Sequence, residues 1–292
     1  MLQLTGSLPA LVTPFVEGQL DLEAVHRLVR WHIEQGSSGV VVGGSTGESA
    51  ALAVDELGAL VHVAREAARG RFPVIAGTGS NVTAHAISLA RTAQAEGADA
   101  LLHATGFYNR PSPRQVVAHF RAIAEACPLP LLVYDVPART GQALSLETLA
   151  EIATIPNVSG IKDATGQVAQ VAHQRRRIAR PFAYLSGDDA SALGYMAMGG
   201  HGCISVTANI APAACARVMA LAAAGDFAAA REQHERLLPL HAALFLEPSP
   251  AGIKYAMARA GLCREELRAP LLPVEPATRA AIDEALVLAG VA

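Results

Sequence analysis

Lys162 is the residue of this sequence whose type and position suggest chemistry most directly. It ends the short apolar stretch 158–161, which reads as a buried strand, and Asp163 follows it at once. An ammonium group is costly to remove from water, so a lysine kept in an apolar setting often serves as an uncharged amine that attacks carbonyl carbons. The alternative is a lysine at a strand end that reaches solvent. Lys162 alone does not separate these two readings.

Other polar residues follow the neighbouring apolar stretches. These stretches run on into glycine-rich or polar sequence at residues 43–49, 77–79, 107–112, 134–141, 187–189 and 205–209. A phenol such as Tyr134 can transfer the protons that imine formation needs. A glycine-rich loop with hydroxyls offers N–H donors to a carboxylate, and Arg139 can bind a second carboxylate through two hydrogen bonds. With the Lys162 amine, these residue types indicate a class I aldolase-like site for a 2-oxo acid.

The elements that must position these residues alternate along the chain. Eight short apolar stretches read as strands covered on both faces, at residues 8–13, 39–42, 74–76, 100–103, 131–134, 158–162, 183–186 and 202–205. Amphipathic helical patterns lie between them, with Asp21 and Asp55 as expected N-caps and Ser112-Pro113 as a helix start. This alternation predicts a (β/α)8 TIM barrel, in which active sites lie at the carboxyl ends of the strands. The alternative, a doubly wound open sheet, usually carries a glycine-rich turn after its first strand, and residues 12–15 contain none.

Strand-like sequence stops after about residue 210. Helical, alanine-rich sequence continues from there, and no low-complexity linker interrupts it. A chain of 292 residues fits one barrel of about 250 residues with a short appendage. We therefore expect a barrel with the active site over residues 1–224 and a small C-terminal helical region over residues 225–292.

Composition and charge exclude several classes of protein. Apolar residues make up 51% of the chain and charged residues 17%, which argues against disorder. The formal net charge of -3 gives no electrostatic reason to expect nucleic acid or an anionic membrane as a partner. No apolar run is long enough to span a membrane, and residues 1–6 do not resemble a secretory leader.

The cysteines and histidines indicate a reducing compartment and no metal. Cys127, Cys203, Cys215 and Cys263 are scattered without a C-x-x-C pair, which is typical of reduced thiols in a cytoplasmic protein. The ten histidines include no H-E-x-x-H motif or other paired metal spacing. We therefore expect a cytoplasmic protein without a bound metal ion.

Five motifs of the sequence, taken in order, resemble one known family. They are Gly43-Gly44-Ser45-Thr46-Gly47-Glu48, Tyr108-Asn109-Arg110-Pro111-Ser112, Tyr134-Asp135-Val136-Pro137-Ala138-Arg139-Thr140-Gly141, Gly160-Ile161-Lys162-Asp163 and Gly187-Asp188-Asp189. The resemblance is to the dihydrodipicolinate synthase / N-acetylneuraminate lyase family, nearest its synthase members, and it covers essentially the whole chain. It implies a lyase that condenses pyruvate with aspartate 4-semialdehyde, on the way to lysine and diaminopimelate. It also implies no cofactor beyond a lysine imine, and a homotetramer built as a dimer of dimers.

The resemblance further implies catalytic roles for individual residues. Lys162 would form the Schiff base with pyruvate, and Tyr134 would shuttle protons during imine formation and condensation. Ser45 and Tyr108 would complete a hydroxyl relay with Tyr134. In this family the tyrosine matching Tyr108 reaches in from a neighbouring subunit.

Four more residues are expected to bind substrate on the same grounds. The main-chain N–H of Thr46 would help to hold the pyruvate carboxylate, and Arg139 would bind the carboxylate of the aldehyde. Gly187 and Ile204 would line the pocket through their main-chain groups.

The sequence departs from the usual synthase pattern at three places. Ser45 stands where threonine is usual, which keeps the hydroxyl but loses the methyl group that stiffens the side chain. Asp135 replaces a usual asparagine, and the sequence offers no physical account of its effect. Residues 247–254 also differ from the usual ending of that segment.

A further departure concerns feedback by lysine. Members that lysine inhibits bind it at a dimer interface, and the matching positions here are Ser49, Ala50, Val54, Leu57, Asn81, His85 and Phe107. His85 replaces a glutamate that would pair with the lysine ammonium, and a desolvated ammonium without such a partner binds poorly. We therefore expect weak or absent inhibition by lysine.

Three functions remain open on the sequence alone. The first is the condensation of pyruvate with aspartate 4-semialdehyde. The second is a sister lyase that uses the same imine with another aldehyde, such as an N-acetylneuraminate, 2-keto-3-deoxygluconate or hydroxy-oxoglutarate lyase. Arg139 favours a carboxylated aldehyde and so the first. The third is a non-catalytic ligand-binding barrel, against which the intact set of lysine, tyrosine and hydroxyl groups argues.

Overall fold

The computed structural model describes residues 4–291, and within them a parallel sheet closes into a barrel. Its eight strands follow the order β1-β10-β9-β8-β7-β6-β5-β4. Their bounds are β1 (Gly6–Pro9), β4 (Val40–Val42), β5 (Val74–Gly77), β6 (Ala100–Ala104), β7 (Leu131–Asp135), β8 (Val158–Asp163), β9 (Ala183–Ser186) and β10 (Gly202–Ser205). A parallel bridge between Ala10 and Val41 joins the two ends of this order. The expected absence of a leader concerns residues 1–3 in part, which lie outside the described residues.

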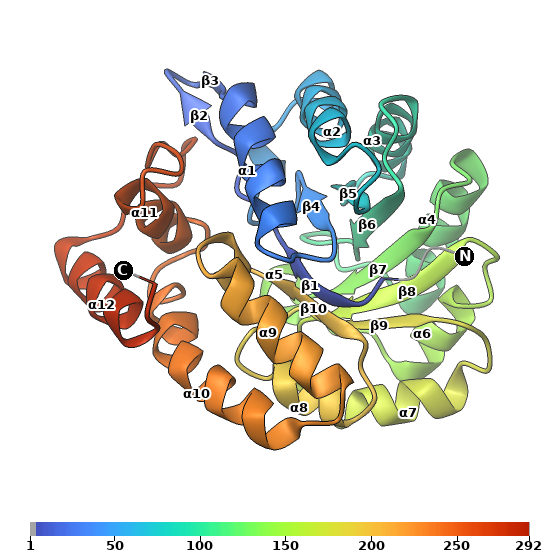
Figure 1. Ribbon diagram of the computed structural model, residues 1–292. Helices are drawn as coiled ribbons and strands as arrows, with labels where there is room; N and C mark the ends of the chain where they lie inside the picture. Colours follow the sequence, from blue (N-terminus) through green and yellow to red (C-terminus); the bar gives the residue numbers. More distant parts are fainter. Residues whose placement is uncertain (1–3, 292) are drawn as a thin grey trace.

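Helices surround the barrel, as Figure 1 shows. The helices that follow the strands are α1 (Leu22–Glu34), α2 (Val54–Ala68), α3 (Thr83–Ala95), α4 (Pro113–Ala126), α6 (Leu146–Ile152), α7 (Gln170–Arg177), α8 (Ala192–Ala197) and α9 (Pro212–Ala223). Short helical turns, η1 (Ser49–Ala51), α5 (Pro137–Thr140) and η2 (Thr207–Asn209), lie in the loops after β4, β7 and β10. The predicted (β/α)8 barrel is therefore confirmed.

The core has two layers because side chains alternate along each strand. Inward-facing residues such as Leu8, Ile75, Leu102 and Leu132 form a cluster inside the barrel. Residues between them, such as Val133, face the helices and join a larger outer cluster. Burial on both faces explains why each strand reads as a continuous apolar run.

Seven of the eight predicted strands agree with the structure to within one residue at each end, and the first does not. It was expected at residues 8–13, whereas β1 spans Gly6–Pro9. Past Pro9 the Leu11 N–H still donates to the Val41 carbonyl at 2.9 Å, and the chain leaves the ladder at Val12, whose N–H donates to the Asn209 side chain at 3.0 Å instead of to a strand. A small hairpin of β2 (Phe15–Val16) and β3 (Gln19–Leu20) follows, which was not predicted.

The helix starts show which sequence signals were decisive. Asp21 caps α1 as predicted, since its Oδ1 accepts from the Ala24 N–H at 2.9 Å. The predicted cap at Asp55 is wrong, because α2 already begins at Val54. There the Glu56 carboxylate accepts from the Ala53 N–H at 2.9 Å, which satisfies a donor of the first turn. The α4 start at Ser112-Pro113 is confirmed.

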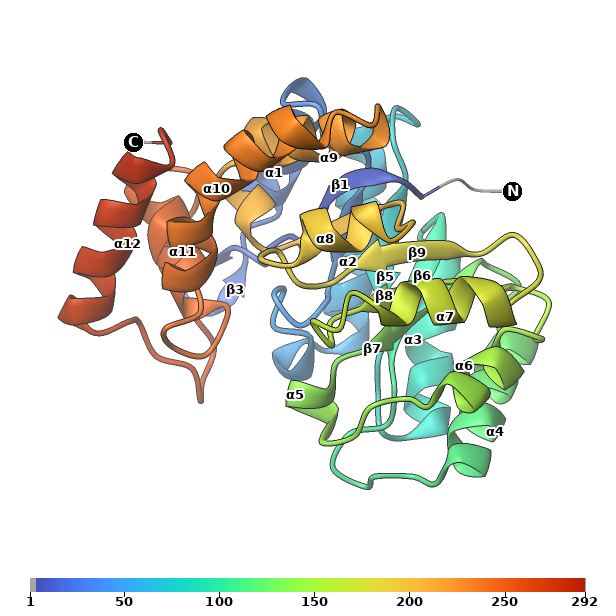
Figure 2. The same cartoon turned by 90° about the horizontal axis from the view of Figure 1, so that it is seen from below.

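A C-terminal region of three helices packs beside the barrel. These are α10 (Phe227–Ala243), α11 (Ala251–Arg259) and α12 (Pro276–Leu288), drawn orange to red in Figures 1 and 2. Helix α10 lies against α9 and α12. The predicted division after residue 224 falls in the turn between α9 and α10, and whether it separates two domains stays a prediction. Within residues 4–291, no helix combines the length and the apolar character that crossing a membrane requires.

Candidate active site

Strands β7 and β8 bring Lys162 and Tyr134 together inside the barrel. The two residues are register partners on neighbouring strands, and both are buried. The Lys162 Nζ lies 4.2 Å from the centre of the Tyr134 ring. No carboxylate among residues 4–291 lies within ion-pair distance of this amine. The alternative of a lysine that reaches solvent from the strand end is therefore wrong.

Gly187 fixes the path of the Lys162 side chain. A Cβ at position 187 would lie 2.9 Å from Lys162 Cε, 3.0 Å from its Cγ and 2.9 Å from Ala164 Cβ. Only glycine leaves the lysine its present position without a shift. The Gly187 N–H donates to the Asp163 carbonyl at 2.7 Å, which extends the β8–β9 pairing by one residue. Ile204 lies on β10 and belongs to the buried cluster inside the barrel.

The glycine-rich loop, residues 43–48, follows β4. It turns sharply, with the Glu48 N–H donating to the Ser45 carbonyl at 3.1 Å and the Ser49 N–H donating to the Gly44 carbonyl at 3.2 Å. The Thr13 hydroxyl donates to the Gly47 carbonyl at 2.7 Å and ties the loop to the segment after β1. Thr46 is buried, and its main-chain N–H donates to no acceptor in the described part of the chain. Such a donor suits an anionic ligand.

A cavity of about 480 Å³ opens beside the glycine-rich loop. Its lining includes Ser45, Tyr134 and Arg139, each predicted as a site residue, together with Glu48 and Arg268, which were not. Arg139 is exposed, and its guanidinium makes no ion pair with any residue the structure describes. The arginine is therefore available to an anionic ligand in the cavity.

The remaining predicted residues do not line this cavity. Lys162 and Ile204 are buried on β8 and β10, Gly187 is half-buried directly after β9, and Thr46 is buried within its loop. Tyr108 is 89% exposed, on the loop after β6, with a left-handed φ of 63°.

The predicted hydroxyl relay is not formed by this single chain. Over residues 4–291 no hydrogen bond joins Ser45, Tyr134 and Tyr108. The structure thus brings Lys162, Tyr134 and the groups expected to bind carboxylates to the carboxyl ends of the strands, and it leaves Tyr108 outside. The roles of all these residues stay predictions.

The surroundings of Asp135 show a physical effect of this carboxyl group that the sequence did not reveal. It is buried, it faces Asp163 in the strand register, and it accepts from the Leu144 N–H at 3.2 Å. Burial, with a smaller contribution from the Asp163 charge, raises the pKa of Asp135 to about 7. A titratable carboxyl group therefore stands directly beside Tyr134 in the chain.

A second hollow, of about 270 Å³, is also lined by Gly43 of the glycine-rich loop. Its lining includes six of the seven positions matched to lysine binding, namely Ser49, Ala50, Leu57, Asn81, His85 and Phe107. Val54 is not among them. Gly43, Gly77, Gly79 and Phe107 line both hollows, so the two are adjacent.

The C-terminal region contributes to the site, which was not predicted from the sequence. Lys254 and Arg268 contact the glycine-rich loop through Glu48, and the segment after Arg268 lines the cavity. Lys254 carried a usable signal, because it stands in an apolar stretch as Lys162 does. Arg268 carried none, since its partners are more than 200 residues away in sequence.

The described histidines, cysteines and carboxylates are not grouped for metal binding. Between residues 4 and 291, no group of three or more such side chains is arranged to hold an ion. The expectation that the protein works without a metal stays a prediction.

Comparison with known proteins points to one family. The profile of the dihydrodipicolinate synthetase family matches residues 3–288. The chain is similar to two proteins named 4-hydroxy-tetrahydrodipicolinate synthase. The one from Ruegeria pomeroyi is 49% identical over 285 residues, which are 98% of each chain. The one from Phenylobacterium zucineum is 50% identical over 285 residues, which are 98% of this chain and 97% of the relative.

A solved structure supports the same relationship. The chloride-inhibited dihydrodipicolinate synthase of Acinetobacter baumannii, complexed with pyruvate, is 41% identical in sequence and superposes with a TM-score of 0.97. The match covers 99% of this chain and 100% of that one.

Proposed function

We propose that this chain, which belongs to the dihydrodipicolinate synthetase family, is a 4-hydroxy-tetrahydrodipicolinate synthase. It condenses pyruvate with aspartate 4-semialdehyde, as a lyase of lysine and diaminopimelate biosynthesis. Relatives of that name match nearly the whole chain at 46–50% identity. The enzyme uses no cofactor other than the imine that its own lysine forms with the substrate.

One observation carries this proposal beyond the family name. The Lys162 amine is buried at the carboxyl end of β8, it lies against the Tyr134 ring and it has no described carboxylate partner. Barrel enzymes place their reactive groups at this end of the strands. A buried amine beside a phenol provides the nucleophile and a proton-transfer group that imine chemistry uses.

The chemistry follows from that pair. The uncharged Lys162 amine attacks C2 of pyruvate, and the carbinolamine loses water to give an imine. The imine withdraws electrons, so a proton leaves the pyruvate methyl group and an enamine forms. The enamine carbon attacks the aldehyde carbon, and as the new C–C bond forms the aldehyde oxygen takes up a proton and the imine is restored. The aldehyde's amino group then attacks the imine carbon and displaces Lys162. Tyr134 and Ser45 transfer protons during these steps.

Two groups hold the carboxylates of the substrates. The Thr46 N–H, which has no acceptor in the described chain, suits the pyruvate carboxylate. Arg139 lies exposed at the cavity and suits the carboxylate of the aldehyde. A sister lyase whose aldehyde is a neutral sugar has no such use for Arg139, so the synthase is the better-supported reading.

The assembly and location belong to the same proposal. The enzyme is a homotetramer built as a dimer of dimers, in which the exposed Tyr108 reaches the site of a neighbouring subunit. It works in the cytoplasm, which is consistent with four free cysteines.

Borohydride trapping tests the proposal directly. Incubation with pyruvate and borohydride, followed by peptide mass spectrometry, should add a reduced pyruvyl group to Lys162, and Lys162→Ala should abolish the addition. A coupled assay with aspartate 4-semialdehyde and a reductase, run beside an N-acetylneuraminate cleavage assay, then identifies the aldehyde. Absence of trapping would point to a non-catalytic barrel. Turnover in the cleavage assay alone would identify a sister lyase.

A further inference from the structure

Glu48, the last residue of the glycine-rich loop, is held by the C-terminal region. Its carboxylate is buried, and its Oε1 lies 2.5 Å from the Nζ of Lys254. Lys254 lies on α11, and its side chain is fully buried. The Oε2 of Glu48 accepts from the main-chain N–H of Arg268 at 2.9 Å. Lys254 also donates to the Glu266 carbonyl at 2.6 Å. Both carboxylate oxygens of a loop residue are thus occupied by groups from the far end of the chain.

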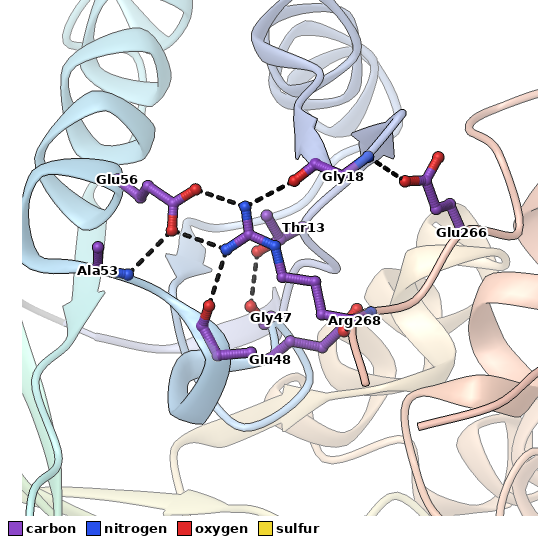
Figure 3. Close-up of polar contacts among 9 residues, drawn as sticks. Thr13, Gly18, Gly47, Glu48, Ala53, Glu56, Glu266 and Arg268 are labelled. Atoms are coloured by element: carbon purple, nitrogen blue, oxygen red, sulfur yellow. Dashed lines mark hydrogen bonds and ion pairs between the residues drawn. The ribbon is translucent and has the colours of Figure 1, made fainter. Parts of the chain in front are cut away.

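The Arg268 side chain ties the same segment to the barrel at further points. Its guanidinium pairs with both oxygens of Glu56 on α2, and it donates to the Ala51 carbonyl at 2.7 Å and to the Gly18 carbonyl at 2.9 Å. Figure 3 shows the guanidinium between Glu56 and Gly18, with Glu48 beside the main chain of Arg268. The Glu266 carboxylate accepts from the Gly18 N–H on the β2–β3 turn.

The loop needs this support because its backbone is strained at Glu48. Glu48 has a left-handed φ of 57°, which a residue with a Cβ adopts only when its surroundings enforce it. The Glu48 N–H also closes the turn on the Ser45 carbonyl. The position of Glu48 therefore sets the position of Ser45 and of the Thr46 N–H between them.

The segment around Arg268 also forms a wall of the substrate cavity. The C-terminal residues that line it are Ser249, Pro250, Arg268, Ala269, Pro270 and Leu271. The glycine-rich loop forms another part of the wall through Gly43, Gly44, Ser45 and Glu48. The contacts of Glu48 and Arg268 therefore join two parts of the wall of one cavity.

We infer that Glu48, Lys254 and Arg268 are positioning residues through which the C-terminal region holds the glycine-rich loop in its pyruvate-binding shape, which rests on the function proposed above. None of the three has to touch the reacting atoms. Their effect passes through the orientation of Ser45 and of the Thr46 N–H. Pyruvate binding should therefore be more sensitive to them than aldehyde binding, because Arg139 lies on α5, outside these contacts.

A role in stability alone is the competing explanation. Buried ion pairs contribute little net stability relative to apolar residues of the same size, although removal of one partner is destabilising. Thermal stability therefore cannot distinguish the two explanations. A selective change in the response to pyruvate can.

Two variants and one matched control make the test. Arg268→Gln removes the guanidinium contacts to α2 and to the β2–β3 turn. Glu56→Gln weakens the ion pair between Arg268 and α2 from its other partner. Because Glu56 is partly exposed, this variant is expected to fold and to test the positioning role even if Arg268→Gln does not fold. The control is Arg279→Gln, which breaks an arginine–carboxylate pair with Glu265 inside the C-terminal region at 2.8 Å, away from the loop.

The readouts are the half-saturating concentration of each substrate in the coupled assay and of pyruvate in borohydride trapping. Arg268→Gln should raise the value for pyruvate about tenfold and leave that for aspartate 4-semialdehyde within about twofold. Glu56→Gln should raise the pyruvate value about threefold. The control should leave both values within about twofold of wild type.

Two results would overturn the inference, and they are distinguishable. If pyruvate traps the wild-type enzyme but Arg268→Gln and Glu56→Gln respond to pyruvate as the Arg279→Gln control does, the positioning role is wrong and the proposed function stands. Failure of pyruvate to trap the wild-type enzyme removes the proposed function, and the positioning role with it.

Discussion

A single oxygen atom separates tyrosine from phenylalanine at position 134, and that atom carries the expected chemistry. The Tyr134 ring packs against the Lys162 amine at 4.2 Å, and Tyr134→Phe keeps this packing. We expect the variant to be trapped by pyruvate and borohydride while kcat falls by about 10²–10⁴-fold, the usual contribution of a proton-transfer group. Steady-state kinetics beside trapping measures both effects. A kcat near that of wild type would remove Tyr134 from the mechanism.

Asp135 should make stability depend on pH in an unusual direction. Burial raises its pKa to about 7 in the folded protein, above its ordinary value of 3.8. Between about pH 4 and pH 7 the folded state therefore binds more protons than the unfolded state, and stability falls as pH rises. Asp135→Asn keeps an acceptor for the Leu144 N–H without this titration. We expect it to become more stable than wild type by about 1 kcal/mol for each pH unit across that window.

Thermal melting at a series of pH values checks the Asp135 prediction. The control is Asp55→Asn on the exposed first turn of α2, which should follow the wild-type curve. The difference in melting temperature between Asp135→Asn and wild type should grow from pH 4 to pH 7 and then level off. Parallel curves for the two proteins would show that Asp135 does not titrate in this range.

At the scale of elements, the sequence predicts the strands and helices whose positions depend on the local pattern of apolar and polar residues. Strands buried on both faces give continuous apolar runs, so β4 to β10 could be located closely, together with the residues at their carboxyl ends. The end of β1 could not, because Asn209, far along the chain, captures the Val12 N–H. The prediction of Asp55 as the cap of α2 was wrong for a local reason, since Glu56 accepts from the Ala53 N–H from within the helix.

The contribution of the C-terminal region to the cavity wall could not be predicted from any local sequence pattern. The Arg268 contacts to Glu56 and Glu48 depend on how α11 and the segment after it fold back over the barrel mouth. No periodicity or spacing encodes a partner more than 200 residues away. Motif resemblance found the groups expected to react, whereas the groups that hold them required the structure.

The packing of β9 against β8 gives a prediction about Gly187. An added Cβ would meet the Lys162 side chain at 2.9 Å and Ala164 at 2.9 Å, so Gly187→Ala must displace the lysine. A misplacement of this kind costs up to about 10²-fold in rate, and we expect trapping to slow accordingly. Gly194→Ala on α8, where an added Cβ meets Val168 no closer than 3.4 Å, is the matched control. Equal trapping rates for the two variants would contradict the role of Gly187.

At the scale of the whole molecule, the hollow next to the substrate cavity is the place where lysine would be expected to bind. Six positions expected to receive lysine line it, but His85 stands where a glutamate would pair with the ammonium group. A desolvated ammonium without a carboxylate partner binds poorly. We expect calorimetry to detect no micromolar binding of lysine, and His85→Glu to strengthen binding. Tight binding by the wild-type enzyme would refute this prediction.

Tyr108 is the residue through which catalysis is expected to depend on assembly, since its side chain is 89% exposed on a loop with a left-handed φ. If Tyr108 completes a neighbour's site, two inactive variants should complement one another. Lys162→Ala and Tyr108→Ala subunits, mixed and allowed to reassociate, would form hybrids in which one site has both residues. Half of randomly formed dimers are hybrids with one intact site of two, so activity should recover to about a quarter of wild type. Ultracentrifugation would follow the reassociation. Recovery no greater than the sum of the parents, in mixtures shown to contain hybrids, would mean that Tyr108 acts only within its own subunit or not at all.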